Sequence, residues 1–213
     1  MNSSGISAIM LAAGLSARMG GRDKLLLEYM GKTLLQRAVE LLDSLPVSEK
    51  ILVTTGARLK HICDLPCLAV PGVTAGETAA RAPGAPPAIR VVINPAPETG
   101  QSKSLRLGLG AASGEWFLFL TGDQPLLTPG HIQPMLELAE RNADKIIFPS
   151  INGKPCSPSL FAASFRDELL SLTGDTGGRA VRDKSPQACL AFVAEYPEGF
   201  IDIDDEAGYL TLL

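Results

Sequence analysis

The sequence predicts an α/β fold in which helices cover a doubly wound, mostly parallel sheet. Short apolar runs, which are typical of buried strands, alternate along the chain with stretches of helical period. Strands separated by single helices favour parallel pairing, because a parallel pair needs a long crossover connection. Polar loops follow two of the apolar runs, and in open α/β sheets ligands bind at the carboxyl ends of the strands.

Five apolar runs predict the strands, and the stretches between them predict the helices. The expected strands cover 7–11, 50–55, 89–94, 115–123 and 144–150. The expected helices cover 33–45, about 57–63, 104–112 and 130–142. The clearest helix is 33–45, where the spacing of the apolar residues places them on one face. Pro134 either lies in the first turn of the last helix or kinks it.

Length and composition indicate a globular protein of one domain, spanning 1–213. Residues 71–88, "PGVTAGETAARAPGAPPA", lack a periodic apolar face, which indicates a flexible insertion, with a functional lid as the alternative. The formal net charge of −4 gives no basic field that would attract nucleic acid. No apolar run approaches the roughly 18 residues of a membrane helix, and the N-terminus lacks the pattern of a signal peptide. We therefore predict a cytoplasmic protein that binds neither nucleic acid nor membrane.

The cysteines and histidines show no pattern of a zinc site or a catalytic triad. Cys63 and Cys67 lie four residues apart, but no second pair of Cys or His completes a set of zinc ligands. Neither His61 nor His131 stands in the arrangement that a triad requires. We therefore expect reduced structural thiols and structural histidines.

The stretch "LAAGLSARMGGRDK", residues 11–24, directly follows the first predicted strand. Gly14 and the small residues near it allow backbone N–H groups to approach a ligand closely. Arg18 and Lys24 add cationic side chains that can neutralise phosphate oxygens. A phosphate-binding loop is one interpretation, and a glycine-rich turn with solvated charges is the other.

Acidic residues supply a second candidate site. Asp123, in "LTGDQP" at 120–125, ends a buried strand, where it is well placed to hold a divalent cation beside a phosphate. In "DIDDE" at 202–206, Asp202 and Asp204 face the same side of an extended segment. One of them could join Asp123 at the metal, and our hypothesis assigns Asp204. The alternative is a solvated acidic turn.

Taken together, these motifs resemble the MobA-like nucleotidyltransferases, and among them the molybdenum cofactor cytidylyltransferase branch. The resemblance rests on "LAAGLSARMGGRDK", "GQSKSLRLGL", "LTGDQP", "LTGDTGGR" and "DIDDEAGYL", and it runs from residue 6 to about 210, interrupted at 65–88. It implies a Rossmann-like fold of the nucleotide-diphospho-sugar transferase type, with an NTP and Mg²⁺ bound at the strand ends. One departure is "CSPSLF" at 156–161, where the family has "GHP" before "LF".

The resemblance also implies roles for individual residues. It assigns Lys24 to the nucleotide and Asp123 to the metal, and with the cationic Arg18 these are the residues that we expect to carry catalysis. Asn94 would lie near the ribose or base, and Ser102 and Ser104 begin a helix whose N–H groups could face the nucleotide. The residues expected to bind nucleotide are Leu11, Ala12, Ala13, Gly14, Lys24, Asn94, Ser102 and Ser104.

The reaction that the resemblance implies is transfer of CMP from CTP to the terminal phosphate of molybdopterin, with release of pyrophosphate and delivery of the product to a molybdoenzyme. A phosphate nucleophile is already ionised at neutral pH, so no general base is needed. Ala13 replaces a glycine of guanine-using relatives, which favours CTP over GTP. The alternatives are guanylyl or other NTP transfer to a different phosphorylated acceptor, and a non-catalytic chaperone that binds the molybdenum cofactor.

Overall fold

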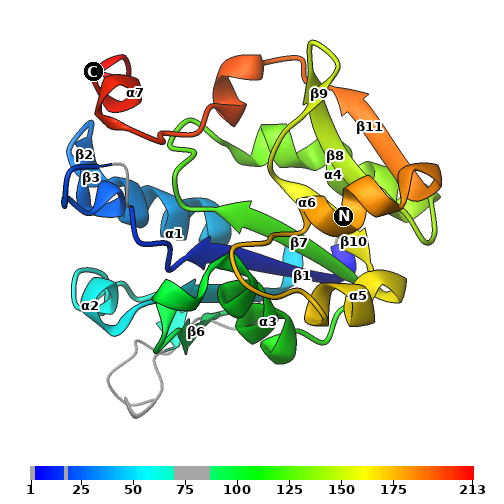
Figure 1. Ribbon diagram of the computed structural model, residues 1–213, viewed down its shortest axis with the longest axis horizontal. Helices are drawn as coiled ribbons and strands as arrows, with labels where there is room; N and C mark the ends of the chain where they lie inside the picture. The colour runs from blue at the N-terminus through cyan, green and yellow to red at the C-terminus, as the bar shows by residue number, and fades with distance from the viewer. Residues whose placement is uncertain (1–2, 17–18, 70–86) are drawn as a thin grey trace.

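The computed structural model describes residues 3–16, 19–69 and 87–213 of the chain (Figure 1). In these residues one large sheet holds nine strands. Eight of them follow the spatial order β5 (Leu68–Ala69), β6 (Ile89–Ile93), β4 (Val47–Thr54), β1 (Ser3–Ala12), β7 (Trp116–Thr121), β10 (Ser159–Ala162), β8 (Ile146–Ile151) and β11 (Cys189–Val193). The ninth, β9 (Lys154–Pro155), pairs with β8, and β2 (Glu28–Tyr29) and β3 (Lys32–Thr33) form a separate ribbon.

Most strand pairs of the large sheet are parallel, which confirms the predicted fold class. β1 lies parallel to both β4 and β7, β6 lies parallel to β4 and β5, and β11 lies parallel to β8. The antiparallel exceptions are β10, which lies between β7 and β8, and the short β9. Each of the five predicted strands is present. The sequence pattern missed the short strands β5, β9, β10 and β11, which have two to five residues each.

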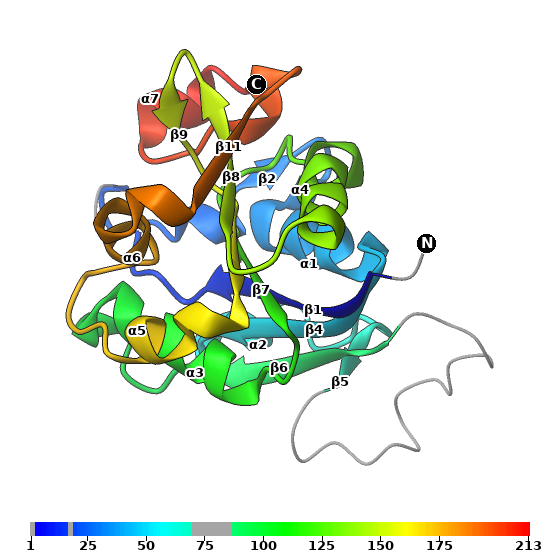
Figure 2. The same cartoon turned by 90° about the vertical axis from the view of Figure 1, so that its right-hand side faces the viewer.

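Helices cover both faces of the sheet (Figure 2). α1 (Leu34–Ser44) and α4 (Pro129–Arg141) pack on one face, and α3 (Gln101–Ala111) and α5 (Arg166–Leu170) pack on the other. Successive side chains of a strand point to opposite faces, so Ala8 and Met10 of β1 join the core under α1 and α4. Ile9 between them joins the core under α3.

The helix boundaries follow local chemistry. α1 begins after Thr33, which forms a capping box with Gln36. α2 (Gly56–Leu59) is shorter than the predicted 57–63, and α3 begins three residues before the predicted 104. α4 begins at Pro129, so Pro134 lies inside the helix, beyond its first turn. The C-terminal part adds α6 (Arg179–Lys184) and α7 (Glu206–Leu210).

Three further sequence predictions concern the insertion, the number of domains and membrane-spanning helices. The insertion predicted at 71–88 lies outside the described residues except for 87 and 88, and the single domain over 1–213 stays a prediction. Within the residues that the structure describes, no helix has both the length and the apolar character needed to cross a membrane.

Candidate active site

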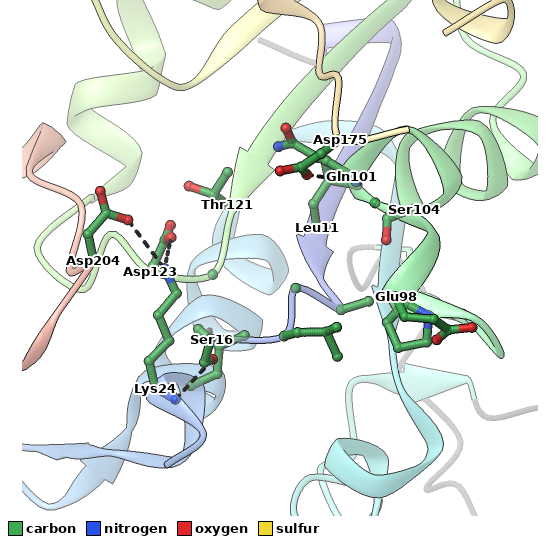
Figure 3. A pocket seen from close by; sticks show the side chains of 17 residues that line it. Leu11, Ser16, Lys24, Glu98, Gln101, Ser104, Thr121, Asp123, Asp175 and Asp204 are labelled. Atoms are coloured by element: carbon green, nitrogen blue, oxygen red, sulfur yellow. Dashed lines mark hydrogen bonds and ion pairs between the residues drawn. The ribbon is translucent and has the colours of Figure 1, made fainter. Parts of the chain in front are cut away.

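A cavity of about 540 Å³ opens at the carboxyl ends of β1 and β7. The two strands lie side by side in parallel, with Leu11 opposite Thr121, so the loops that follow them meet. Figure 3 shows how the lining side chains face this cavity. Its lining includes Leu11, Ala13, Gly14, Leu15, Ser16, Lys24, Gln101, Ser104, Thr121, Asp123, Asp175 and Asp204.

Lys24 and Asp123 form a close ion pair in this first cavity, although 99 positions separate them in the sequence. Lys24 Nζ lies 2.6 Å from Asp123 Oδ2, and 3.6 Å from Asp204 Oδ1 (Figure 3). The Lys24 side chain is 16% exposed and that of Asp123 is 17% exposed, so water screens this pair only partly. Lys24 therefore lies between the half-buried carboxylate of Asp123 and the more exposed carboxylate of Asp204.

A third carboxyl group, that of Asp202, lines the second cavity and is close enough for its charge to interact with these residues. Burial raises the pKa of Asp202 to about 7, and the charges of Asp123 and Asp204 act in the same direction. The charge of Lys24 and a hydrogen bond with Gln124 lower that pKa, but by less. Asp202 is therefore partly protonated at neutral pH, and a cation bound nearby would favour its ionised form.

The carboxylates here fit a divalent cation. Asp123 Oδ1 is buried and has no hydrogen-bond partner among the described residues, so one of its oxygens is left to coordinate a ligand. Within the same residues no cluster of three or more His, Cys, Asp or Glu side chains could hold a metal. Mg²⁺ commonly binds through one or two carboxylates and completes its shell with substrate phosphates and water. The donor set suits that mode of binding.

The structure brings together most, but not all, of the predicted site residues. Seven line the first cavity: Leu11, Ala13, Gly14, Lys24, Ser104, Asp123 and Asp204. Ala12, Asn94 and Ser102 are buried and do not line it. Arg18 lies outside the described residues.

Asn94 lies behind the wall of the first cavity and supports Ser104. Its Nδ2 donates to Ser104 Oγ at 2.9 Å, and its Oδ1 accepts from the backbone N–H of Ala96. A place for Asn94 near the ribose or base therefore stays a prediction, and any such role would act through Ser104. Its amide joins the end of β6 to α3 and fixes Ser104, which does line the cavity.

The N-terminus of α3 also differs from the prediction. The N–H of Ser102 donates to the carbonyl of Gly174 at 3.2 Å, and the N–H of Gln101 donates to Asp175 Oδ1 at 3.3 Å. A loop at 172–178, the "LTGDTGGR" motif without its arginine, thus lies against this helix end. These two N–H groups are already bonded to the loop and do not face a nucleotide.

A second cavity of about 610 Å³ adjoins the first and shares Leu11, Gln101, Thr121 and Asp175 with it. Thr121 Oγ1 is buried at this junction without a hydrogen-bond partner in the described part of the chain. Polar side chains of the second cavity come mostly from the C-terminal half: Ser157, Ser159, Thr176, Arg179, Arg182, Asp183 and Asp202. Sequence reasoning considered only Asp202 among these residues, as an alternative to Asp204 at the metal, although the "LTGDTGGR" motif marked the neighbourhood of the others.

Comparison with known proteins agrees with this geometry. A family model described as the MobA-like NTP transferase domain matches residues 8–189. The chain belongs to this family. The match confirms the resemblance found in the sequence and assigns the chain to a family of nucleotidyltransferases. No curated protein sequence matches the chain.

Solved structures share the fold of this MobA-like protein. A nucleotidyl transferase from Methanothermobacter thermautotroptrophicus has a TM-score of 0.74 at 23% identity, over 97% of this chain and 95% of that one. Rv0371c from Mycobacterium tuberculosis H37Rv, in complex with manganese, has a TM-score of 0.61 at 22% identity, over 98% and 97%. A 4-diphosphocytidyl-2C-methyl-D-erythritol synthase from Anaerococcus prevotii DSM 20548 has a TM-score of 0.69 at 18% identity, over 99% and 95%. These likenesses confirm the Rossmann-like α/β fold.

Proposed function

We propose that this protein transfers CMP from CTP to the terminal phosphate of molybdopterin and releases pyrophosphate. An oxygen of the acceptor phosphate attacks the α-phosphorus of CTP, and the bond from that phosphorus to the bridging oxygen of the β-phosphate breaks. The observation that carries the proposal is the Lys24–Asp123 pair, held 2.6 Å apart in a cavity at the carboxyl ends of β1 and β7. Catalysis of this kind depends on positioning and charge neutralisation.

The first cavity is the proposed donor site. The loop after β1 presents Ala13, Gly14 and Leu15 to the cavity, and Lys24 provides the charge that a triphosphate requires. The Ala13 methyl group narrows the space for a base, which favours a pyrimidine over a purine. The synthase from Anaerococcus prevotii, whose name refers to a cytidyl product, supports a cytidylyl donor by analogy of fold.

Mg²⁺ is the proposed metal, and Asp123 and Asp204 are the residues that would hold it. When bound, the ion would neutralise the developing charge on the phosphates. The unpartnered Oδ1 of Asp123 supports this assignment, as does the manganese complex of the Mycobacterium tuberculosis relative. Lys24 would then orient the phosphate chain beside the ion, and Arg18 is proposed to assist it.

The second cavity is the proposed acceptor site. Arg179 and Arg182 line it and pair with Asp183 at 3.4 and 3.0 Å, and the buried Arg182 also makes a cation–π contact, 5.0 Å from the ring centre of Phe148. A phosphate of the acceptor would compete with the exposed Asp183 carboxylate for these two arginines. Molybdopterin itself is proposed from the resemblance of the sequence motifs, and a molybdoenzyme is the proposed receiver of the product.

The site needs no proton acceptor for this reaction, because a phosphate nucleophile is ionised at neutral pH. Among the residues that the structure describes, no histidine lines either cavity. The cytoplasm is the proposed compartment.

Pyrophosphate release tests the proposal when CTP, GTP, ATP and UTP are each supplied with Mg²⁺ and molybdopterin. We expect release with CTP, and a loss of at least about tenfold in Lys24→Ala, because charge-assisted hydrogen bonds to phosphate disappear. Lys32→Ala is the matched control, since Lys32 pairs with Glu40 outside the cavity. Release with GTP alone would refute the choice of base, and release only with another phosphorylated acceptor would refute molybdopterin. Binding of molybdopterin without release from any NTP would indicate the chaperone alternative.

A further inference from the structure

Arg58 lies behind the donor loop and is almost completely buried, with 4% of its surface exposed. It belongs to α2, which follows β4, and its guanidinium group reaches into the loop after β1. Nη1 donates to the carbonyl of Ala12 at 2.8 Å, and Nη2 donates to the carbonyl of Gly14 at 2.6 Å. Nε and Nη2 also form a bidentate pair with Asp23, at 2.6 and 2.8 Å.

The two carbonyl bonds fix the orientation of the loop. In a planar trans peptide, the carbonyl of one residue and the N–H of the next point in opposite directions. Because Arg58 holds the carbonyls of Ala12 and Gly14, the N–H groups of Ala13 and Leu15 must point away from Arg58. Ala13 and Leu15 line the first cavity, whereas Arg58 does not. The guanidinium group thus sets the direction of N–H groups at the proposed donor site.

The pair with Asp23 fixes the other end of the same loop. Asp23 Oδ1 accepts from the N–H of Leu25 and caps η1 (Lys24–Leu26), the short helix on which Lys24 lies. The N–H of Lys24 donates to Ser16 Oγ at 3.1 Å, and that oxygen lies 3.4 Å from Arg58 Nη2. The buried side chain of Arg58 therefore connects the first part of the loop, residues 12–15, to the backbone on which Lys24 lies.

We propose that Arg58 is a positioning residue for nucleotide binding, which sets the spacing between the loop N–H groups and the Lys24 ammonium group. This inference rests on the proposed donor site. All three guanidinium nitrogens already donate within the protein, so Arg58 acts through the loop and not by contact with the nucleotide. Lysine cannot replace it, because an ammonium group lacks the planar fork that reaches both carbonyls and the carboxylate.

The test is the dissociation constant of each of the four NTPs with Mg²⁺ and no acceptor, measured by calorimetry well below the melting temperature. We expect Arg58→Ala to weaken binding of the preferred NTP at least about tenfold and Arg58→Lys to restore little of it. Guanidinium ion at millimolar concentration should recover part of the affinity of Arg58→Ala and none of that of Lys24→Ala. Arg90→Ala is the control, because Arg90 donates to the carbonyl of Ala111, away from the site.

Asp23→Asn is the second variant and keeps the inference testable if Arg58→Ala does not fold. The asparagine oxygen can still cap η1, but Arg58 loses its carboxylate partner, so we expect weaker NTP binding together with a lower melting temperature. A lower melting temperature with unchanged affinity in Asp23→Asn or Arg58→Lys would overturn the inference and leave a structural role only. If the wild type binds GTP in place of CTP, the proposed base is refuted. The inference about Arg58 is then tested by comparing the affinity of the variants for GTP. No binding of any NTP by the wild type would refute the donor site and the inference together.

Discussion

Replacement of Gly100 by alanine should destabilise the protein at the place where the 172–178 loop meets α3. Gly100 precedes α3 and has φ of +99° and ψ of 175°, a conformation that is essentially restricted to glycine. A Cβ at this position would overlap the backbone C and O of Gly174 and would lie 2.6 Å from the backbone N of Asp175. Backbone atoms cannot rotate away, so the loop itself must shift.

The magnitude follows from two costs. Holding a residue with a side chain in this backbone region costs about 1–3 kcal/mol. Forcing an extra methyl group into packed atoms costs about 1–3 kcal/mol more. The free energy of unfolding should therefore fall by about 2–6 kcal/mol, which corresponds to a loss of about 4–24 °C in melting temperature for a chain of this size.

Thermal unfolding followed by circular dichroism measures this effect, and Gly110→Ala provides a matched control. Gly110 lies in the same helix, and a Cβ built there meets no atom within 4 Å. Alanine is the better helix former by about 1 kcal/mol, so this control should melt at the wild-type temperature or slightly above it. A Gly100→Ala protein that melts within about 2 °C of the wild type would show that the 172–178 loop moves without cost and would refute the reasoning.

Three further predictions concern charge, metal and base. Burial raises the pKa of Glu49, but hydrogen bonds from Ser7 and Ser113 outweigh burial and hold that pKa below its ordinary value of 4.5. The ionised Glu49 therefore stabilises the fold above pH 4.5 and loses this effect as the pH falls through its lowered pKa. Glu49→Gln should be less stable at pH 7 by urea unfolding, and the difference should close as the pH falls below 4.5. Asp123→Asn should abolish Mg²⁺-dependent pyrophosphate release. If the variant keeps its activity and the same dependence on Mg²⁺ concentration as the wild type, the metal is held elsewhere. Ala13→Gly should relax a preference of roughly 10- to 200-fold for CTP over GTP in kcat/KM without improving the use of CTP, and a wild type that favours GTP would contradict this reading.

Much of the fold could be predicted because the long buried strands have a strong local signal. Their apolar runs and the helical patterns between them correctly predicted the parallel strands β1, β4, β6 and β7. β10, with four residues, has too short a pattern to be recognised, and its place between β7 and β8 depends on contacts that are distant in sequence.

The site was predictable to a similar degree. Lys24 and Asp123 follow strands that the fold class places side by side, so their meeting could be foreseen. Ser104 lines the cavity, whereas Asn94 and Ser102 are buried behind its wall. The sequence could not predict this difference, because a motif does not show which of its side chains face a cavity. Arg58 shows no local pattern, since its partners lie 35 to 46 positions away in the sequence.

The position of β10 has a consequence for how the chain folds. β7 and β8 precede β10 in the chain, yet β10 lies between them and pairs with both. Until residues 159–162 emerge during synthesis, β7 and β8 each have an edge that lacks its final partner, and apolar residues such as Phe117 and Ile146 lie along these edges. Insertion of β10 therefore comes late and joins residues that are far apart in the chain, which slows folding. Partly folded chains with these open strand edges are the species most prone to aggregate, so yield on refolding should fall steeply as protein concentration rises.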